Sequence, residues 1–84
     1  MSGGYFQHHQ YLISDIADEI KMVIIKNKDS EYKLSQKTIN EFLKAIKILK
    51  QAKIYADRID WLLSYDDSEK SFHERLQEEL KEAE

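Results

Sequence analysis

The chain of 84 residues contains no cysteine and no proline, and its two glycines, Gly3 and Gly4, are adjacent near the N-terminus. Without cysteine it can hold neither a disulfide framework nor a zinc site built on thiolates. Without proline, and with glycine confined to one place, it lacks the turn residues that β-hairpins use. These absences favour an all-α fold.

Long apolar segments are also missing. The longest run, Met22 to Ile25, is far too short to cross a bilayer, so we expect no contact with a membrane. No secretory signal precedes this run, and a cytoplasmic location is therefore expected. We expect a flexible N-terminus over residues 1–4 and a single helical domain over residues 5–84, because a chain of this length forms one small domain.

Apolar residues recur along the chain at steps of three and four, which is the spacing of one helix face. The pattern predicts three helices, near residues 5–28, 35–65 and 67–82, and no strand. Leu34, Ser35 and Ile39 fit a hydrophobic staple around a serine N-cap at the start of the second helix. Short connections predict a long antiparallel helical hairpin, made by the first two helices, and a short C-terminal helix.

The second helix is longer than the first and apolar on more than one side. One of its stripes is a heptad-spaced seam that the other two helices are not expected to cover. The seam residues are Phe42, Ala45, Leu49, Ala52, Ala56, Ile59 and Leu63. The seam therefore predicts a homo-oligomer, either a dimer or a multiple of one, in which paired second helices form a helical bundle.

Aromatic, histidine and arginine residues are expected to meet at one end of the helical hairpin. Arginine can hold an anion with two parallel hydrogen bonds, and flat rings stack on nucleobases. The cluster predicts binding of a small, anionic, nucleotide-like ligand, whereas the alternative is that its rings close the end of a small core. The candidate ligand-binding residues are Tyr5, His8, His9, Tyr55, Arg58, Trp61, His73 and Arg75.

Charge is distributed unevenly, since residues 33–53 are rich in lysine and residues 54–84 are rich in carboxylates. We expect the third helix to fold its acidic face over Lys47, Lys50 and Lys53, so that the charges neutralise one another. The whole chain has a net charge of −3, and we expect no binding to DNA or RNA.

The residues that carry catalytic or metal chemistry lack the spacing that this chemistry requires. His8 and His9 are adjacent and would point about 100° apart on a helix, so they do not share an ion. The chain has no glycine loop that cradles phosphate, no nucleophile elbow and no His-Ser-Asp arrangement. The sequence predicts a protein that is not an enzyme and that has no metal or cofactor.

Two acidic groups lie on neighbouring predicted helices. Asp15, Asp18 and Glu19 on the first, with Asp57 and Asp60 on the second, resemble the magnesium-binding residues of the all-alpha nucleoside triphosphate pyrophosphatases. The resemblance implies a magnesium-dependent enzyme as a distant alternative. About 13 Å of helix separates the two groups within one chain, so only a partner subunit could bring them together. The other interpretation is a solvated acidic face.

The stretch RIDWLLSYDDSEKSFHERL, residues 58–76, is similar to a stretch of short, uncharacterised bacteriophage proteins. Such proteins are often accessory or anti-defence factors. Several unrelated helical ones form oligomers that sequester host signalling nucleotides, and others block a host protein directly. The resemblance implies action in the host cytoplasm and identifies no residue as functional.

Two hypotheses on function follow. The first is an oligomeric protein that sequesters a nucleotide-like anion, and it predicts a discrete pocket where arginine and aromatic side chains converge. The second is a protein-interaction module that inhibits or regulates a host protein. It predicts an exposed apolar surface and no such pocket.

Overall fold

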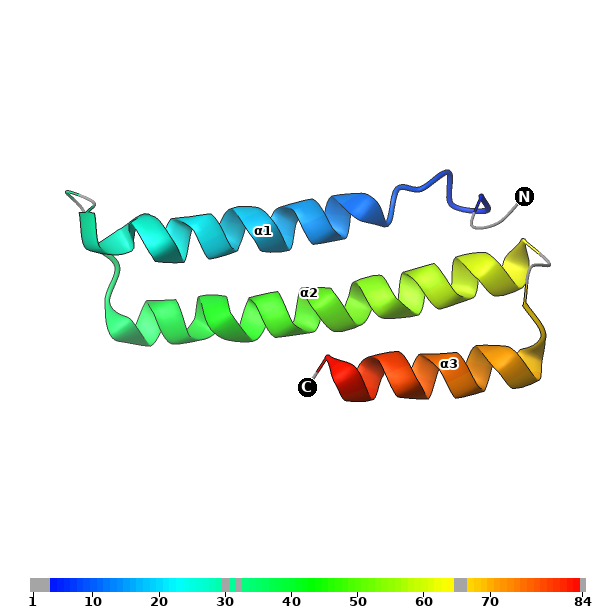
Figure 1. Ribbon diagram of the computed structural model, residues 1–84. Coiled ribbons are helices and arrows are strands. Elements are labelled where there is room, and N and C mark those ends of the chain that lie inside the picture. The colour runs from blue at the N-terminus through cyan, green and yellow to red at the C-terminus, as the bar shows by residue number, and fades with distance from the viewer. Residues whose placement is uncertain (1–3, 30, 32, 65–66, 84) are drawn as a thin grey trace.

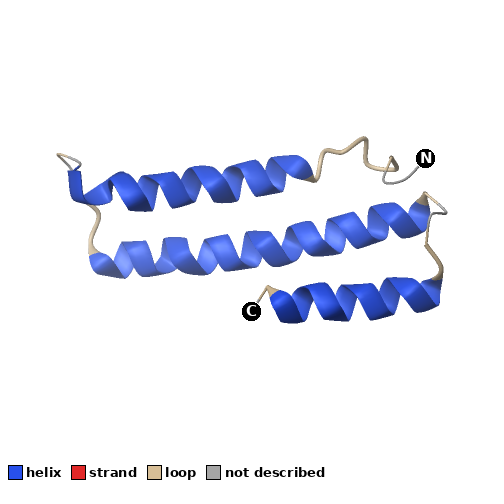
Figure 2. Ribbon diagram, viewed as in Figure 1, coloured by secondary structure: helices blue, strands red, loops and turns tan. Residues whose placement is uncertain are grey.

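The computed structural model of the protein describes residues 4–29, 31, 33–64 and 67–83. The elements in chain order are α1 (Tyr11–Lys26), the short 3-10 helix η1 (Asn27–Asp29), α2 (Gln36–Leu63) and α3 (Glu69–Glu82) (Figure 1). The described residues contain no strand, so the prediction of an all-helical fold with three α-helices is confirmed (Figure 2). Residues 1–3 and 65, which the predicted N-terminus and second helix include, lie outside the described part.

The first helix begins later than the sequence predicted. Residues 5–10 form turns, and α1 starts at Tyr11 rather than at Tyr5. Gln7 and His8 have positive φ angles of 54° and 63°, which a right-handed helix does not accommodate. The backbone amides of Tyr5 and Phe6 donate hydrogen bonds to the Asp60 side chain. A contact from a distant part of the chain thus fixes the non-helical segment.

Local hydrogen bonds set the start of the other two helices. The Ser35 Oγ accepts a hydrogen bond from the Thr38 amide at 3.3 Å, so the serine N-cap predicted for α2 is confirmed. Just before this cap, the Asn27 side chain donates to the Leu34 carbonyl and accepts from the Leu34 amide. Ser68 caps α3 in the same way by accepting from the Ser71 amide at 3.1 Å.

The three helices lie side by side in a single layer. α1 and α3 contact opposite sides of α2, and each runs antiparallel to it (Figure 1). Within the described part of the chain, α1 and α3 do not contact each other. Its extents along the three principal axes are 50, 24 and 12 Å, so the molecule is long and thin.

A single layer encloses little of its apolar surface. Among the described residues, the buried apolar side chains are Ala17, Ile39, Ile46 and Leu76. The accessible surface is 6535 Å², whereas a compact monomer of this mass exposes about 5,200 Å². The radius of gyration is 15.9 Å, against about 12 Å for a compact domain of this length. The excess surface is what a second layer of helices could cover.

The two sides of the layer expose different stripes of α1 and α2. Helical periodicity places an exposed stripe of α1 and the seam of α2 on the same side, which we call the apolar face. A groove lined by both Ile13 and Ala56 confirms that these surfaces of α1 and α2 adjoin. The apolar face comprises Leu12, Ile16, Ile20 and Val23 of α1 with Phe42, Ala45, Leu49, Ala52, Ala56, Ile59 and Leu63 of α2.

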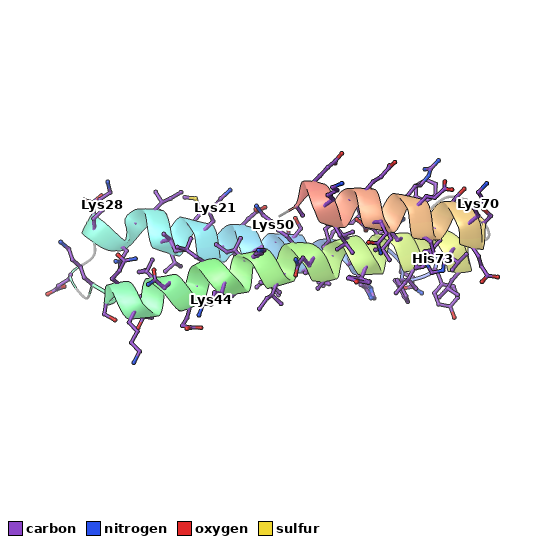
Figure 3. All side chains as sticks on the ribbon, turned by 90° about the horizontal axis from the view of Figure 1, so that it is seen from below. Lys21, Lys28, Lys44, Lys50, Lys70 and His73 are labelled. Carbon is purple, nitrogen blue, oxygen red and sulfur yellow. The ribbon has the colours of Figure 1, made fainter. Side chains whose placement is uncertain are left out.

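The opposite side, the polar face, carries charged side chains. Lys21 lies on the surface of α1 opposite its apolar stripe, and Lys47 and Lys50 of α2 are exposed. Viewed along its plane, the layer projects Lys21 and Lys28 on one side and Lys44 and His73 on the other (Figure 3). Lys53 and Asp57 pair at 2.6 Å on the side of α2 that faces α1. Helical periodicity also places Ile25 of α1 and Leu43 of α2 on the polar face, and they are 56% and 51% exposed.

Candidate functional site

The apolar face exposes several large side chains of α1. On α1, Leu12 is 59% exposed, Ile16 50% and Val23 47%. Along the seam of α2, Ala52 and Leu63 are exposed and the other five residues are half-buried. Contiguous exposed apolar surface is typical of interaction sites in soluble proteins. The side chains predicted to form an oligomer interface therefore lie together on one accessible face.

A groove of about 520 Å³ lies at one end of the apolar face, between the N-terminal segment and α2. Tyr5, Phe6 and His9 contribute rings to it, and Ile13 and Ala56 contribute aliphatic surface; Gln7 and Gln10 complete the lining. The Tyr5 and Phe6 rings meet edge to face, with centroids 5.3 Å apart. Apolar and aromatic walls suit an apolar side chain better than a charged group.

Asp60 holds the wall of this groove in place. Its carboxylate is fully buried and accepts hydrogen bonds from the amides of Tyr5 and Phe6, from Gln10 Nε2 at 2.8 Å and from the Ser64 hydroxyl. Burial acts to raise the pKa of Asp60, but these hydrogen bonds outweigh it and hold the pKa below its ordinary value. Asp60 thus stays ionised and fixes the N-terminal segment against α2.

Gln10 and Asp60 are positioning residues that the sequence analysis did not identify as such. Gln10 is 6% exposed, and its amide orientation follows from Asp60, because only the NH₂ group can face a carboxylate. A signal for Asp60 was present in the sequence. It continues the heptad spacing of Ile39, Ile46 and Lys53, which is the stripe of α2 that faces α1.

Arg58 lies on the other side of α2, against α3. Its Nη1 is 3.8 Å from Asp67 Oδ2 and its Nε is 3.5 Å from Glu79 Oε2. The guanidinium also lies 5.5 Å from the centre of the Trp61 ring. Arg58 is 6% exposed, so two carboxylates and an aromatic ring already surround the group that was predicted to hold an anion.

The structure distributes the eight predicted ligand-binding residues over several places. Tyr5 and His9 line the groove on the apolar face. Arg58 and Arg75 line a hollow that they share with Glu78, Glu79 and Glu82.

The remaining predicted residues lie elsewhere. His8 stacks on Tyr11, and His73 meets Phe72 edge to face. Tyr55 borders a third hollow, between α2 and α3, while Trp61 lies beside Arg58. The groove and the two arginines are therefore separate features of the structure.

The acidic residues also have neighbours within the chain. Asp57 pairs with Lys53, and Asp60 is enclosed by its hydrogen-bond donors. Across the described residues, no three histidine or carboxylate side chains gather in a group that could hold a metal ion. Neither Asp57 nor Asp60 presents an open carboxylate toward α1, where Asp15, Asp18 and Glu19 are exposed.

In the part of the chain that the structure describes, no helix combines the length and the apolar character needed to cross a membrane. The apolar face, its groove and the buried charges beside them are the features of the described residues that bear on function. Comparison of the chain with protein-family models, with curated proteins and with solved structures finds no match.

Proposed function

We propose that the protein acts by binding other protein surfaces rather than by catalysis, and that its apolar face pairs with the same face of a second copy. The observation that carries this proposal is the single layer of helices, which leaves apolar side chains of α1 and α2 uncovered on one side. Burial of apolar surface is the main favourable term in association, and this face offers a continuous strip of it.

The amount of uncovered surface fits such a role. The accessible surface exceeds that of a compact monomer by roughly a quarter. A stable interface buries about 800 Å² on each partner, which is less than this excess. Pairing two copies through the apolar face would assemble a four-helix core from α1 and α2 of both chains, with each α3 outside it.

A nucleotide-like ligand stays a prediction from the sequence. The structure separates the aromatic groove from Arg58 and Arg75, and three glutamates accompany the two arginines. An exposed apolar surface without a pocket where arginines and rings converge is what the protein-interaction hypothesis predicts. This supports a role in protein interaction, for which we propose a second copy of the chain as the partner, and a host protein as the partner stays a prediction.

Sedimentation equilibrium at micromolar concentration tests the proposal. We expect the wild-type protein to have twice the chain mass of 10.0 kDa. The Ala52→Glu variant should be monomeric, because it buries an unpaired carboxylate at the centre of the pairing surface. Asn40→Glu is the matched control, since it adds the same charge to an exposed position of α2 outside the seam and should remain dimeric.

A monomeric wild-type protein would contradict self-association. In that case the uncovered apolar face would point to a different protein as the partner. A dimer that Ala52→Glu leaves intact would show that another surface makes the interface.

A further inference from the structure

We propose that two copies pair their α2 helices antiparallel, and that Phe42 of each copy inserts into the partner's groove lined by Phe6, Ile13 and Ala56. This inference rests on the proposed self-association and specifies its geometry. The groove opens on the apolar face, and its walls are aromatic and aliphatic. The second copy supplies the ring that occupies it.

The spacing of the seam selects one register. In an antiparallel pair related by a two-fold axis, placing Leu49 opposite the partner's Ala52 also places Ala45 opposite Ala56 and Phe42 opposite Ile59. Each of these three pairs joins two apolar residues, and Leu63 then lies opposite the partner's Thr38. A shift of one heptad in either direction would place Phe42, or Ile59 and Leu63, beyond the end of the partner's helix.

The exposed stripe of α1 independently supports the same axis. Under two-fold pairing, Leu12 meets the partner's Val23, and Ile16 meets the partner's Ile20. The Gln10 side chain is hydrogen-bonded to Asp60, and Ile13 lines the same groove as Ala56. These two contacts fix the position of α1 along the axis of α2. The midpoint of the α1 stripe therefore lies beside the midpoint of the seam, so one axis serves both helices.

The direction of Phe42 leads it to the groove. Periodicity places Phe42 on the edge of the seam nearest α1, the same side as Ile39 and Ile46. The two-fold axis brings the N-terminal segment of one copy to that edge of the other. Phe42 thus approaches the partner near Ala56 and Ile59, where the Phe6 and Tyr5 rings form the wall.

Within one chain the two phenylalanines are far apart. The Phe6 amide donates a hydrogen bond to the Asp60 side chain, and about 27 Å of helix separates Asp60 from Phe42. Any energetic coupling between Phe6 and Phe42 therefore arises between copies. This separation allows a double-mutant cycle to measure the contact directly.

The test measures the dimer Kd by sedimentation for the wild type, Phe42→Ala, Phe6→Ala and the double variant, with circular dichroism to check helix content. We expect Phe42→Ala to raise the Kd by about 30-fold or more, as the loss of an aromatic side chain buried in a partner's pocket does. The double variant should be weakened much less than the product of the two single effects. Tyr11→Ala, which removes an exposed ring outside the groove, should leave the Kd unchanged.

If Phe42→Ala loses helix content, Phe42→Leu replaces it in the cycle, since leucine keeps the apolar bulk without the ring. A wild-type dimer in which the two single effects multiply would overturn the insertion of Phe42 into the groove while leaving self-association intact. A monomeric wild type would instead overturn the proposed function itself.

Discussion

The two halves of α2 are held by different forces. The N-terminal half packs on α1 through Ile39 and Ile46, and α3 ends before reaching it (Figure 1). The C-terminal half lies between the N-terminal segment and α3, and it contains the buried charges of Asp60 and Arg58. One half thus packs on α1 through apolar side chains, whereas the other also contains a buried carboxylate held by hydrogen bonds and a buried guanidinium beside two carboxylates. Antiparallel pairing would bring the more open half of one copy onto the better-covered half of the other.

The largest change in stability is expected at Asp60. Asp60→Ala removes the acceptor for two backbone amides and the Gln10 side chain, so we expect a loss of about 3–4 kcal/mol in the free energy of unfolding. Urea denaturation followed by circular dichroism measures it. Asp57→Ala, three residues earlier, breaks only a partly exposed pair with Lys53 and should cost less than about 1 kcal/mol. Equal losses would contradict the role given to Asp60.

In the N-terminal half, the free energy of unfolding should respond to apolar volume. We expect Ile46→Ala to cost about 2–3 kcal/mol, because it leaves a cavity between α1 and α2. Ile48→Ala makes the same chemical change at a position that is 62% exposed, and it should cost less than about 0.5 kcal/mol. The same denaturation experiment measures both variants. A loss of stability at Ile48 as large as that at Ile46 would mean that another surface covers Ile48.

A smaller effect should appear when the pH is lowered. The pKa of Asp60 is lower in the folded chain than the value of about 3.9 in unfolded chains, so the ionised carboxylate stabilises the fold above that value. This stabilisation is lost as the pH falls through the pKa of Asp60 in the folded chain. We expect the wild type to lose more stability than Asp60→Asn between pH 7 and pH 3, measured by urea midpoints. Parallel curves for the two proteins would exclude this linkage.

The parts of the fold that the sequence predicted depend on local signals. The three helices follow from apolar periodicity, and the N-cap at Ser35 follows from the residues beside it. The predicted start of α1 was wrong. Gln7 and His8 have positive φ angles, and Asp60, which is distant in sequence, accepts hydrogen bonds from the two amides that precede them. No pattern within residues 5–28 contains that information.

The candidate ligand site shows the same limit. Arg58 was assigned to an anion because free arginine side chains hold anions well. The structure surrounds it with Asp67 and Glu79, which reach it through the packing of α3. In contrast, the seam residues share one face as predicted by their heptad spacing, because that spacing is a property of α2 alone. Whether a second copy covers this face stays a prediction.

Disulfide trapping tests the pairing of the two apolar faces most directly, since the chain has no cysteine of its own. A variant with both Ala45→Cys and Ala56→Cys should form a covalent dimer under mild oxidation, because each cysteine meets its counterpart across the interface. Each single variant should stay uncrosslinked, since like positions lie about 16 Å apart along the paired helices. Crosslinking of the double variant alone is the result that our account predicts. Failure of the double variant, or equal crosslinking of either single variant, would contradict it.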